Sequence, residues 1–222
     1  MSLTSTEENY LKALFKISVS NGTGKSGINE LAESLSLKPA SVNEMLKRLK
    51  EKKLVDYEKY GKVELTKTGK SSAVDLIRKH RLWETFLYEK LSFSWEEVHE
   101  VAEELEHIKS KKLIDQLDDF LGNPKFDPHG DPIPDKNGVF IQQSKKTLNE
   151  IEIGARCRMV AVKDNSRTFL QYVVSLGLAI NNEIKIISRE AFDGQLTIEI
   201  NGNEKSVSQK FAENIFVIGT YN

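Results

Sequence analysis

The 222-residue sequence has one cysteine, four histidines, two tryptophans and five prolines. A single cysteine excludes an internal disulfide framework and a cysteine-rich zinc module, and it suits a reducing compartment. No apolar run approaches the roughly 18 residues that a membrane span needs, and the N-terminus lacks the apolar core of a signal peptide. We therefore expect a cytoplasmic protein with no membrane partner.

The sequence also lacks a surplus of charge, since 32 Lys and Arg face 33 Asp and Glu. The average hides a separation: residues 1–75 carry 13 basic and 10 acidic side chains, residues 76–149 carry 11 and 14, and residues 150–222 carry 8 and 9. The front therefore has a charge of +3 and the middle one of −3. Charges sorted in this way indicate separate tasks, and the near-zero total does not exclude a nucleic-acid partner.

The front of the chain predicts three short helices and a hairpin. Apolar residues repeat at helical spacing within residues 11–18, 28–35 and 42–49, and Pro39 is well placed in the first turn of the third helix. Residues 54–58 and 62–66 are typical of two short strands around a turn at Tyr60-Gly61. A helix, a tight turn, a helix and a hairpin form a winged helix-turn-helix pattern.

The third helix and the hairpin have the composition of a DNA-binding surface. Small or polar side chains at the start of a recognition helix can approach base edges, and cations can hold phosphates. An alternative is a solvated basic helix in an unrelated three-helix domain, but the hairpin and the turn spacing favour DNA binding. The candidate DNA-binding residues are Lys38, Pro39, Ala40, Ser41, Asn43, Glu44, Lys47, Arg48, Lys59 and Lys62.

The rest of the chain changes from helices to strands. Residues 76–88 and 95–120 predict two helices, residues 127–134 with three prolines an ordered loop, and residues 140–150 a polar linker. Short β-type runs follow at 157–162, 183–188, 196–200 and 215–218. They are separated by Asn181-Asn182, Asp193-Gly194 and Asn201-Gly202, which are turn signals. Several short strands in this length predict a small barrel.

Histidines and glutamates gather on the two middle helices. His99, Glu103, Glu106 and His107 stand at i, i+4, i+7 and i+8, and therefore lie on one face of a helix. His80 and Glu84 repeat an i, i+4 pair on the preceding helix. Imidazole and carboxylate ligands at this spacing suit a divalent first-row metal, and no thiolate accompanies them. The alternative is a salt-bridged surface, and the number of residues in register favours a metal site.

An enzyme is disfavoured. The run from His99 to Glu103 differs by one residue from the zinc-protease pattern H-E-x-x-H, and its fifth residue is glutamate, so the second zinc imidazole is missing. Cys157 lies in an apolar strand pattern and is typical of a core residue rather than a nucleophile. We therefore expect neither catalysis nor a small-molecule substrate.

Several motifs, in order through about residues 5–140, resemble the diphtheria-toxin-repressor family of bacterial metal-activated transcriptional repressors. They are residues 8–12 (ENYLK), 78–84 (RKHRLWE), the helix at 98–107, and 129–134 (HGDPIP). Residues 175–178 (SLGL) and 182–186 (NEIKI) are similar to the SH3-like domain of that family, which is related to ferrous-transport accessory proteins.

The resemblance implies a mostly α-helical fold with a β C-terminal part. It divides the chain into a winged helix-turn-helix DNA-binding domain at 1–73, a helical dimerisation and metal-binding domain at 74–142, and an SH3-like barrel at 150–222. The implied function is that of a homodimeric repressor that binds a DNA operator when a metal is bound and controls metal-uptake genes.

The family's metal sites can be carried over residue by residue. Its primary site would draw on Asn9, Glu103, Glu106 and His107. Its second site would involve His80, Glu84 and His99, with Asp164 of the barrel in some members, and the proline loop adds His129 and Asp127 as weaker candidates. Two sites per subunit are therefore expected.

The metal predicted from the resemblance is Mn²⁺, with Fe²⁺ as the next choice. Iron-responsive members carry cysteine at the position of Glu103 and methionine at that of Asn9, whereas manganese-responsive members carry glutamate and usually aspartate. Glu103 offers a hard oxygen ligand, and Asn9 offers only its neutral amide oxygen. The alternative is a metal-independent winged-helix regulator whose barrel binds a peptide or small ligand. A chelator would not change the DNA binding of such a protein.

Overall fold

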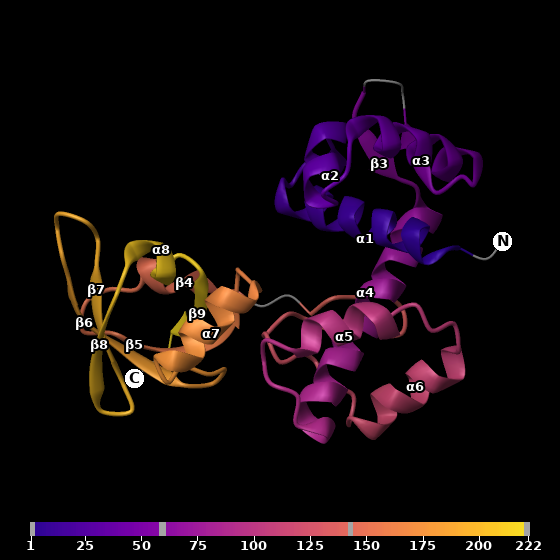
Figure 1. Ribbon diagram of the computed structural model, residues 1–222. Coiled ribbons are helices and arrows are strands. Elements are labelled where there is room, and N and C mark those ends of the chain that lie inside the picture. The colour runs from indigo at the N-terminus through magenta and orange to yellow at the C-terminus, as the bar shows by residue number, and fades with distance from the viewer. Residues whose placement is uncertain (1–2, 58–60, 142–143, 220–222) are drawn as a thin grey trace. The chain divides into compact units, whose positions relative to one another are not determined.

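The computed structural model describes residues 3–57, 61–141 and 144–219 (Figure 1). The chain divides into two compact units. The first consists of Met1–His80, Glu103–Gln116 and Pro134–Phe140, and the second of Arg81–Ala102, Leu117–Ile133 and Ile141–Asn222. Among the described residues, no helix is both long and apolar enough to cross a membrane.

The first unit contains the predicted winged helix-turn-helix. Its helices are α1 (Ser5–Ser20), α2 (Ile28–Ser34) and α3 (Pro39–Glu51), and its strands are β1 (Lys25–Ser26), β2 (Val55–Tyr57) and β3 (Val63–Leu65). The strands form an antiparallel sheet in the order β1-β3-β2. The two-residue strand β1 was not predicted, because it is too short to show an alternating pattern. The predicted turn at Tyr60 and the DNA-binding candidate Lys59 lie outside the described residues.

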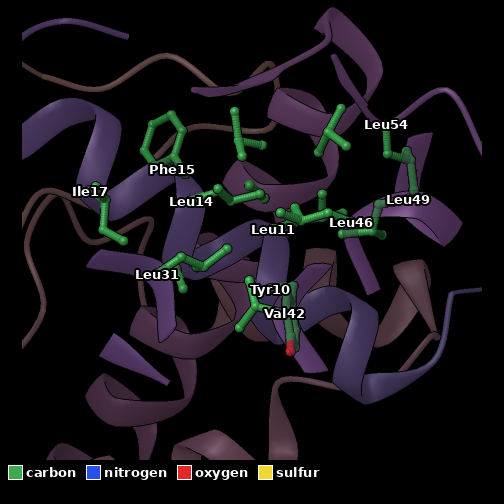
Figure 2. Packing of buried hydrophobic residues seen from close by; sticks show 14 of the residues in the cluster. Tyr10, Leu11, Leu14, Phe15, Ile17, Leu31, Val42, Leu46, Leu49 and Leu54 are labelled. Carbon is green, nitrogen blue, oxygen red and sulfur yellow. The ribbon is translucent and has the colours of Figure 1, made fainter. Parts of the chain in front are cut away.

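The helices of the first unit begin where local chemistry favours a start. Thr4 caps α1: its hydroxyl accepts a hydrogen bond from the Glu7 amide at 3.3 Å, and the Glu7 carboxylate accepts one from the Thr4 amide at 2.9 Å. Pro39 is the first residue of α3, where its missing N–H costs nothing. Leu11, Leu14 and Leu46 then meet in a buried apolar cluster that holds the helices together (Figure 2).

The middle of the chain forms three helices, where two were predicted. They are α4 (Lys67–Leu91), α5 (Val98–Leu105) and α6 (Lys111–Phe120). The prediction of one helix over residues 95–120 is wrong, because the chain turns at residues 106–110 and Ser110 starts a new helix. The Ser110 hydroxyl accepts a hydrogen bond from the Leu113 amide at 3.3 Å. Glu106 and His107 therefore lie just beyond α5 rather than on its face.

The C-terminal part is a six-stranded antiparallel sheet in the order β4-β9-β5-β6-β7-β8. It confirms the predicted β C-terminal part. The elements are β4 (Lys146–Thr147), the 3-10 turn η1 (Leu148–Glu150), β5 (Arg156–Val162), α7 (Arg167–Ser175), β6 (Glu183–Arg189), β7 (Leu196–Ile200), β8 (Asn203–Val207), α8 (Gln209–Ala212) and β9 (Ile215–Gly219).

Two features of this sheet correct the sequence prediction. Leu148 is fully buried in the core of the sheet, so residues 140–150 are not only a polar linker. Strand β8 was missed because Val207 is its one buried residue, as expected for the edge of a sheet. The Asn201-Gly202 signal is confirmed: both residues have positive φ, and they join β7 to β8 as a two-residue hairpin.

The start of α4 is held tightly against the winged-helix part. A Cβ atom on Gly69 would lie 1.9 Å from the carbonyl oxygen of Leu54, a distance that no side chain tolerates. Thr66 adds two hydrogen bonds here: its amide donates to the Leu54 carbonyl at 3.1 Å, and its hydroxyl accepts from the Gly69 amide at 3.1 Å. This contact fixes the helix that carries His80.

We predict that Gly69→Ala destabilises the protein by about 2–3 kcal/mol, because the added methyl group must push two backbone segments apart. Urea denaturation followed by circular dichroism measures the loss. Gly27→Ala is the matched control, since the nearest atoms to its Cβ lie at 3.8 Å, and it should change stability by less than about 1 kcal/mol. Equal effects of the two substitutions would contradict this account of the contact.

Candidate metal centre

The first group of polar side chains, in the first unit, surrounds Glu106. This carboxylate is 1% exposed, and its Oε2 atom lies 2.6 Å from the Lys12 ammonium and 2.5 Å from Nδ1 of His80. Lys12 comes from α1 and is itself 6% exposed, and its Nζ lies 3.3 Å from the same His80 nitrogen. Burial alone would raise the pKa of Glu106, but the hydrogen bond from His80 and the charge of Lys12 outweigh it and lower the pKa.

His107 faces the other oxygen of Glu106. Its Nε2 lies 4.0 Å from Glu106 Oε1, and its Nδ1 lies 2.6 Å from Oε2 of Glu8 on α1. Residues that follow α5 are therefore tied to α1 at two points, through Lys12 and through Glu8. Neither α1 residue was predicted for this group, although both stand one helical turn apart in the same motif as Asn9.

Not all of the predicted primary ligands are gathered in this group. The Glu103 side chain is 57% exposed, and its Oε1 lies 3.9 Å from the Lys12 ammonium. Asn9 is exposed, next to the half-buried Glu8 on α1. Among the described residues, Asn9, Glu103, Glu106 and His107 do not form a compact set of ligand atoms. As a ligand set they stay a prediction.

The second group lies in the second unit and is more compact. The ligand atoms of Glu84 on α4 and of Asp127 and His129 in the following proline loop lie within 4.8 Å of one another, and all three residues are buried. His99 of α5 adds its Nδ1 at 3.0 Å from Oε1 of Glu84. His80, which was predicted with Glu84 and His99, stands one helical turn before Glu84 on α4, and this ligand set stays a prediction.

The geometry of His129 suits a cation. Its Nε2 lies 3.0 Å from the carbonyl oxygen of Trp95, which can only accept a hydrogen bond, so Nε2 carries a proton. The Trp95 ring stacks on the imidazole, and its indole N–H donates to the Pro128 carbonyl at 2.8 Å. Nδ1 is buried, has no hydrogen-bond partner among the described residues, and lies 3.8 Å from Oε1 of Glu84. Nδ1 is therefore the ring nitrogen that faces a carboxylate, and it would become the ligand atom if a cation replaced its proton.

The proton balance of this group reflects excess negative charge. Burial lowers the pKa of His129, but the neighbouring Glu84 and Asp127 carboxylates outweigh burial and raise it to about 9. Burial and the charge of Glu84 raise the pKa of Asp127 to about 7. At neutral pH the group therefore holds a proton on His129 where a divalent cation would otherwise bind, and binding of the cation would release that proton.

The loop that carries Asp127 and His129 is ordered by its own hydrogen bonds. Oδ1 of Asp127 accepts from the amides of His129 and Asp131 at 2.8 and 3.0 Å. Arg81 lies 3.5 Å from Oδ2 of Asp127 and donates to the Pro132 carbonyl at 2.5 Å. Asp127 is thus a stronger candidate than the sequence indicated, because it both organises the loop and faces Glu84 and His129.

Strand β5 of the barrel supports this loop from behind. The His129 carbonyl accepts a hydrogen bond from the Val162 amide at 3.1 Å. A Cβ atom on Gly130 would lie 1.7 Å from the Val160 carbonyl oxygen, so only glycine allows this approach. Asp164, the predicted barrel ligand, is half-buried two residues after Val162. Its Oδ1 accepts from the Ser166 amide at 2.8 Å, and it does not belong to the compact group.

The predicted DNA-binding residues lie mostly on the exposed face of α3. Six of them are exposed on this helix: Pro39, Ala40, Ser41, Glu44, Lys47 and Arg48. Lys38 and Lys62 are also exposed, and Lys47 pairs with Glu44 at 3.2 Å. Asn43 differs, because its amide donates to the Pro39 carbonyl at 2.8 Å and accepts from the Tyr57 hydroxyl. Its side chain therefore holds the helix start and the sheet together.

Three family profiles match successive parts of the chain. Residues 2–63 match the N-terminal DNA-binding domain of iron-dependent repressors, and residues 66–135 match their metal-binding and dimerisation domain. Residues 146–218 match a FeoA domain. A transcriptional regulator called MntR from Oceanobacillus iheyensis is 31% identical over 147 residues, which are 66% of this chain and 96% of that protein.

Solved structures agree over almost the full length. A manganese-dependent transcriptional repressor in complex with manganese is 30% identical, with a TM-score of 0.83 over 96% of this chain and 100% of that chain. The chain covers a smaller share of the length of some curated relatives. It covers 16% of a protein of Chlamydia trachomatis described as a probable metal transport system membrane protein, to which it is 44% identical over 70 residues, or 32% of this chain.

The order of the three matched regions, the MntR relative and the repressor structure lead to the same assignment. The chain belongs to the iron-dependent repressor family of metal-dependent transcriptional regulators.

Proposed function

We propose that this protein is a manganese-responsive repressor that binds a DNA operator as a homodimer and controls genes of metal uptake. In this proposal residues 1–73 bind DNA, residues 74–142 form the dimer and hold metal, and residues 150–222 form the SH3-like barrel. The observation that carries it is the link between α1 and the residues after α5. Through Glu8–His107 and Lys12–Glu106, a helix of the DNA-binding part shares a polar group with the helical middle.

The link explains how metal and DNA binding would be coupled. A divalent cation would displace or supplement the positive charge that Lys12 and His80 now supply to Glu106. Glu106 and His107 would hold α1 at one angle to the helical middle, and α3, which shares a buried core with α1 and α2, would follow. In a dimer this angle sets the distance between two recognition helices, which half-sites about 34–36 Å apart require. Metal favours the DNA-competent arrangement by binding it more tightly.

The donor atoms support manganese as the effector. Glu84, Asp127 and His129 offer two carboxylates and one imidazole, and Glu103 and Glu106 offer two further carboxylates, all hard or borderline ligands. The one thiol cannot contribute, because Cys157 is buried in the sheet core and burial raises its pKa to about 12. We propose that the compact second group is one metal site and that the group around Glu106 is the other.

Removal of a predicted ligand of the first group should abolish the increase in DNA binding that metal causes. We expect Glu103→Ala and His107→Ala each to abolish Mn²⁺-dependent DNA binding while the dimer stays intact. A gel shift on a fragment selected from random DNA by the Mn²⁺-loaded protein measures binding, and sedimentation measures the dimer. Glu104→Ala is the matched control, because this glutamate is an exposed neighbour of Glu103 on α5. If the two ligand variants gave the same Mn²⁺-dependent gel shifts as the parent, the proposed mechanism would be contradicted.

A chelator titration with stepwise addition of Mn²⁺, Fe²⁺ or Zn²⁺ in the same gel-shift assay separates this proposal from its rival. A metal-independent regulator would bind DNA equally well after chelation, whereas a metal-dependent one would lose binding and regain it with the preferred ion. This comparison also ranks Mn²⁺ against Fe²⁺.

Loss of the Lys12 ammonium should destabilise the metal-free protein. Lys12→Met leaves the buried Glu106 carboxylate with His80 alone, and breaking a buried ion pair costs about 3–5 kcal/mol. Urea denaturation in the presence of chelator measures the loss, and excess Mn²⁺ should restore part of it because a cation replaces the lost charge. Lys112→Met on the exposed face of α6 should cost less than about 0.5 kcal/mol. A Lys12→Met protein as stable as the parent would show that Glu106 does not need this cation.

The exposed cations of α3 should contribute through phosphate contacts. We expect Lys47→Ala to weaken DNA binding on all sequences alike and to lower the slope of log affinity against log salt by about one. Fluorescence anisotropy of labelled DNA over a salt series measures both. The control is Lys205→Ala on the exposed edge strand β8, which should leave the slope unchanged. An equal change in both variants would mean that general charge, not α3, is responsible.

A further inference from the structure

A pocket of about 480 Å³ lies in the first unit and shares no lining residue with either carboxylate group. Its volume falls within the roughly 300–1,000 Å³ of small-molecule sites. The first turns of α4 and α6 form its walls together with residues 135–138. Seven Lys or Arg side chains and three aspartates line it, so the pocket has a charge of +4 in a chain whose net charge is −1.

The three aspartates are already engaged. Asp75 pairs with Lys79 at 2.8 Å, and Asp115 pairs with Lys111 at 2.6 Å. Asp135 instead accepts hydrogen bonds from the backbone amides of its own loop, at residues 137 and 139. The aspartates therefore neutralise only part of the positive charge and leave the rest available.

The remaining positive charge comes from side chains and from helix ends. Lys67, Lys70 and Lys136 are exposed and have no ion pair or hydrogen bond with any side chain that the structure describes. The helices α4 and α6 both begin at the pocket, and the N-terminal end of a helix carries a partial positive charge. Arg78 is buried and Lys79 nearly so, which makes the positive wall part of the packed unit rather than a set of flexible tips.

We propose that this pocket binds a multiply charged phosphate group, held by Lys67 and Lys70 at the start of α4 and by Lys136 in the loop of residues 135–138. Phosphate matches both the ammonium donors and the helix N-termini. Two sources can supply it: a free phosphorylated ligand of nucleotide size, or the backbone of bound DNA. The pocket volume favours the free ligand, because a single backbone phosphate would fill only a part of it. The site is separate from the proposed metal sites and does not depend on them.

The first experiment uses inorganic tripolyphosphate as the probe. The protein is treated with chelator and dialysed, because polyphosphates would otherwise remove metal and mimic a loss of function. Isothermal titration at about physiological salt compares the parent with Lys70→Ala/Lys136→Ala. The matched control is Lys112→Ala/Lys125→Ala, which removes the same charge from exposed lysines outside the pocket. We expect the pocket variant to bind at least tenfold more weakly and the control to bind within twofold of the parent.

The second experiment separates the two sources. Binding of a mixed-sequence DNA duplex by the Mn²⁺-loaded protein, without polyphosphate, is measured over a salt series for the same variants. If DNA supplies the phosphate, the pocket variant alone loses affinity and its salt slope falls by up to about two, one for each cation removed. If a free ligand supplies it, tripolyphosphate binding is lost in the pocket variant while DNA binding is unchanged.

Two results would overturn the proposal. One is that neither probe distinguishes the pocket variant from the parent. The other is that the pocket and control variants weaken binding equally, which is what a diffuse basic surface would give. Circular dichroism and urea denaturation of all variants ensure that a loss of binding is not a loss of folding.

Discussion

A carboxylate that is almost out of water requires positive charge next to it, and this requirement organises both polar groups of the protein. The Glu106 carboxylate lies next to the Lys12 ammonium and the His80 ring, and the Glu84 carboxylate lies next to two histidines. In each group the protein's own cation or proton stands where a divalent ion would act. The resting chain is therefore charge-balanced without metal, and metal must displace or supplement an internal partner.

The two groups differ in how completely the chain prepares them. At His129 the tautomer, the ring plane and the loop are all fixed, by Trp95 and by the amides that bond Asp127. Around Glu106 the candidate Glu103 is still largely in solvent. A preorganised site loses little conformational freedom on binding, whereas a half-formed one must order its ligands at that moment. In the proposed mechanism the first group would therefore respond to a change of conformation, and the second would bind its ion with little rearrangement.

Local patterns predicted the parts of the fold that depend on local chemistry. The helical apolar spacing and Pro39 were enough for the winged helix, and Asn201-Gly202 was enough for a hairpin. The break after α5 was missed because the glutamates continue the helical pattern as far as Glu106, just beyond the end of α5, and only a capping serine marks the start of the next helix. The role of Lys12 could not be predicted, since it depends on a partner 94 residues away in sequence.

The contact of Gly130 with strand β5 has a consequence for how the protein can evolve. Because the Val162 amide donates to the His129 carbonyl and the two backbones lie in close contact at Gly130, a shift of the strand would be transmitted to the loop. A ligand that binds the barrel would then change the affinity of His129 for an ion. An ion at His129 would change the affinity of the barrel for that ligand by the same free energy. The barrel is therefore open to selection as an input to the regulator: a ligand acquired on its surface could tune the metal response without altering a single metal-binding residue.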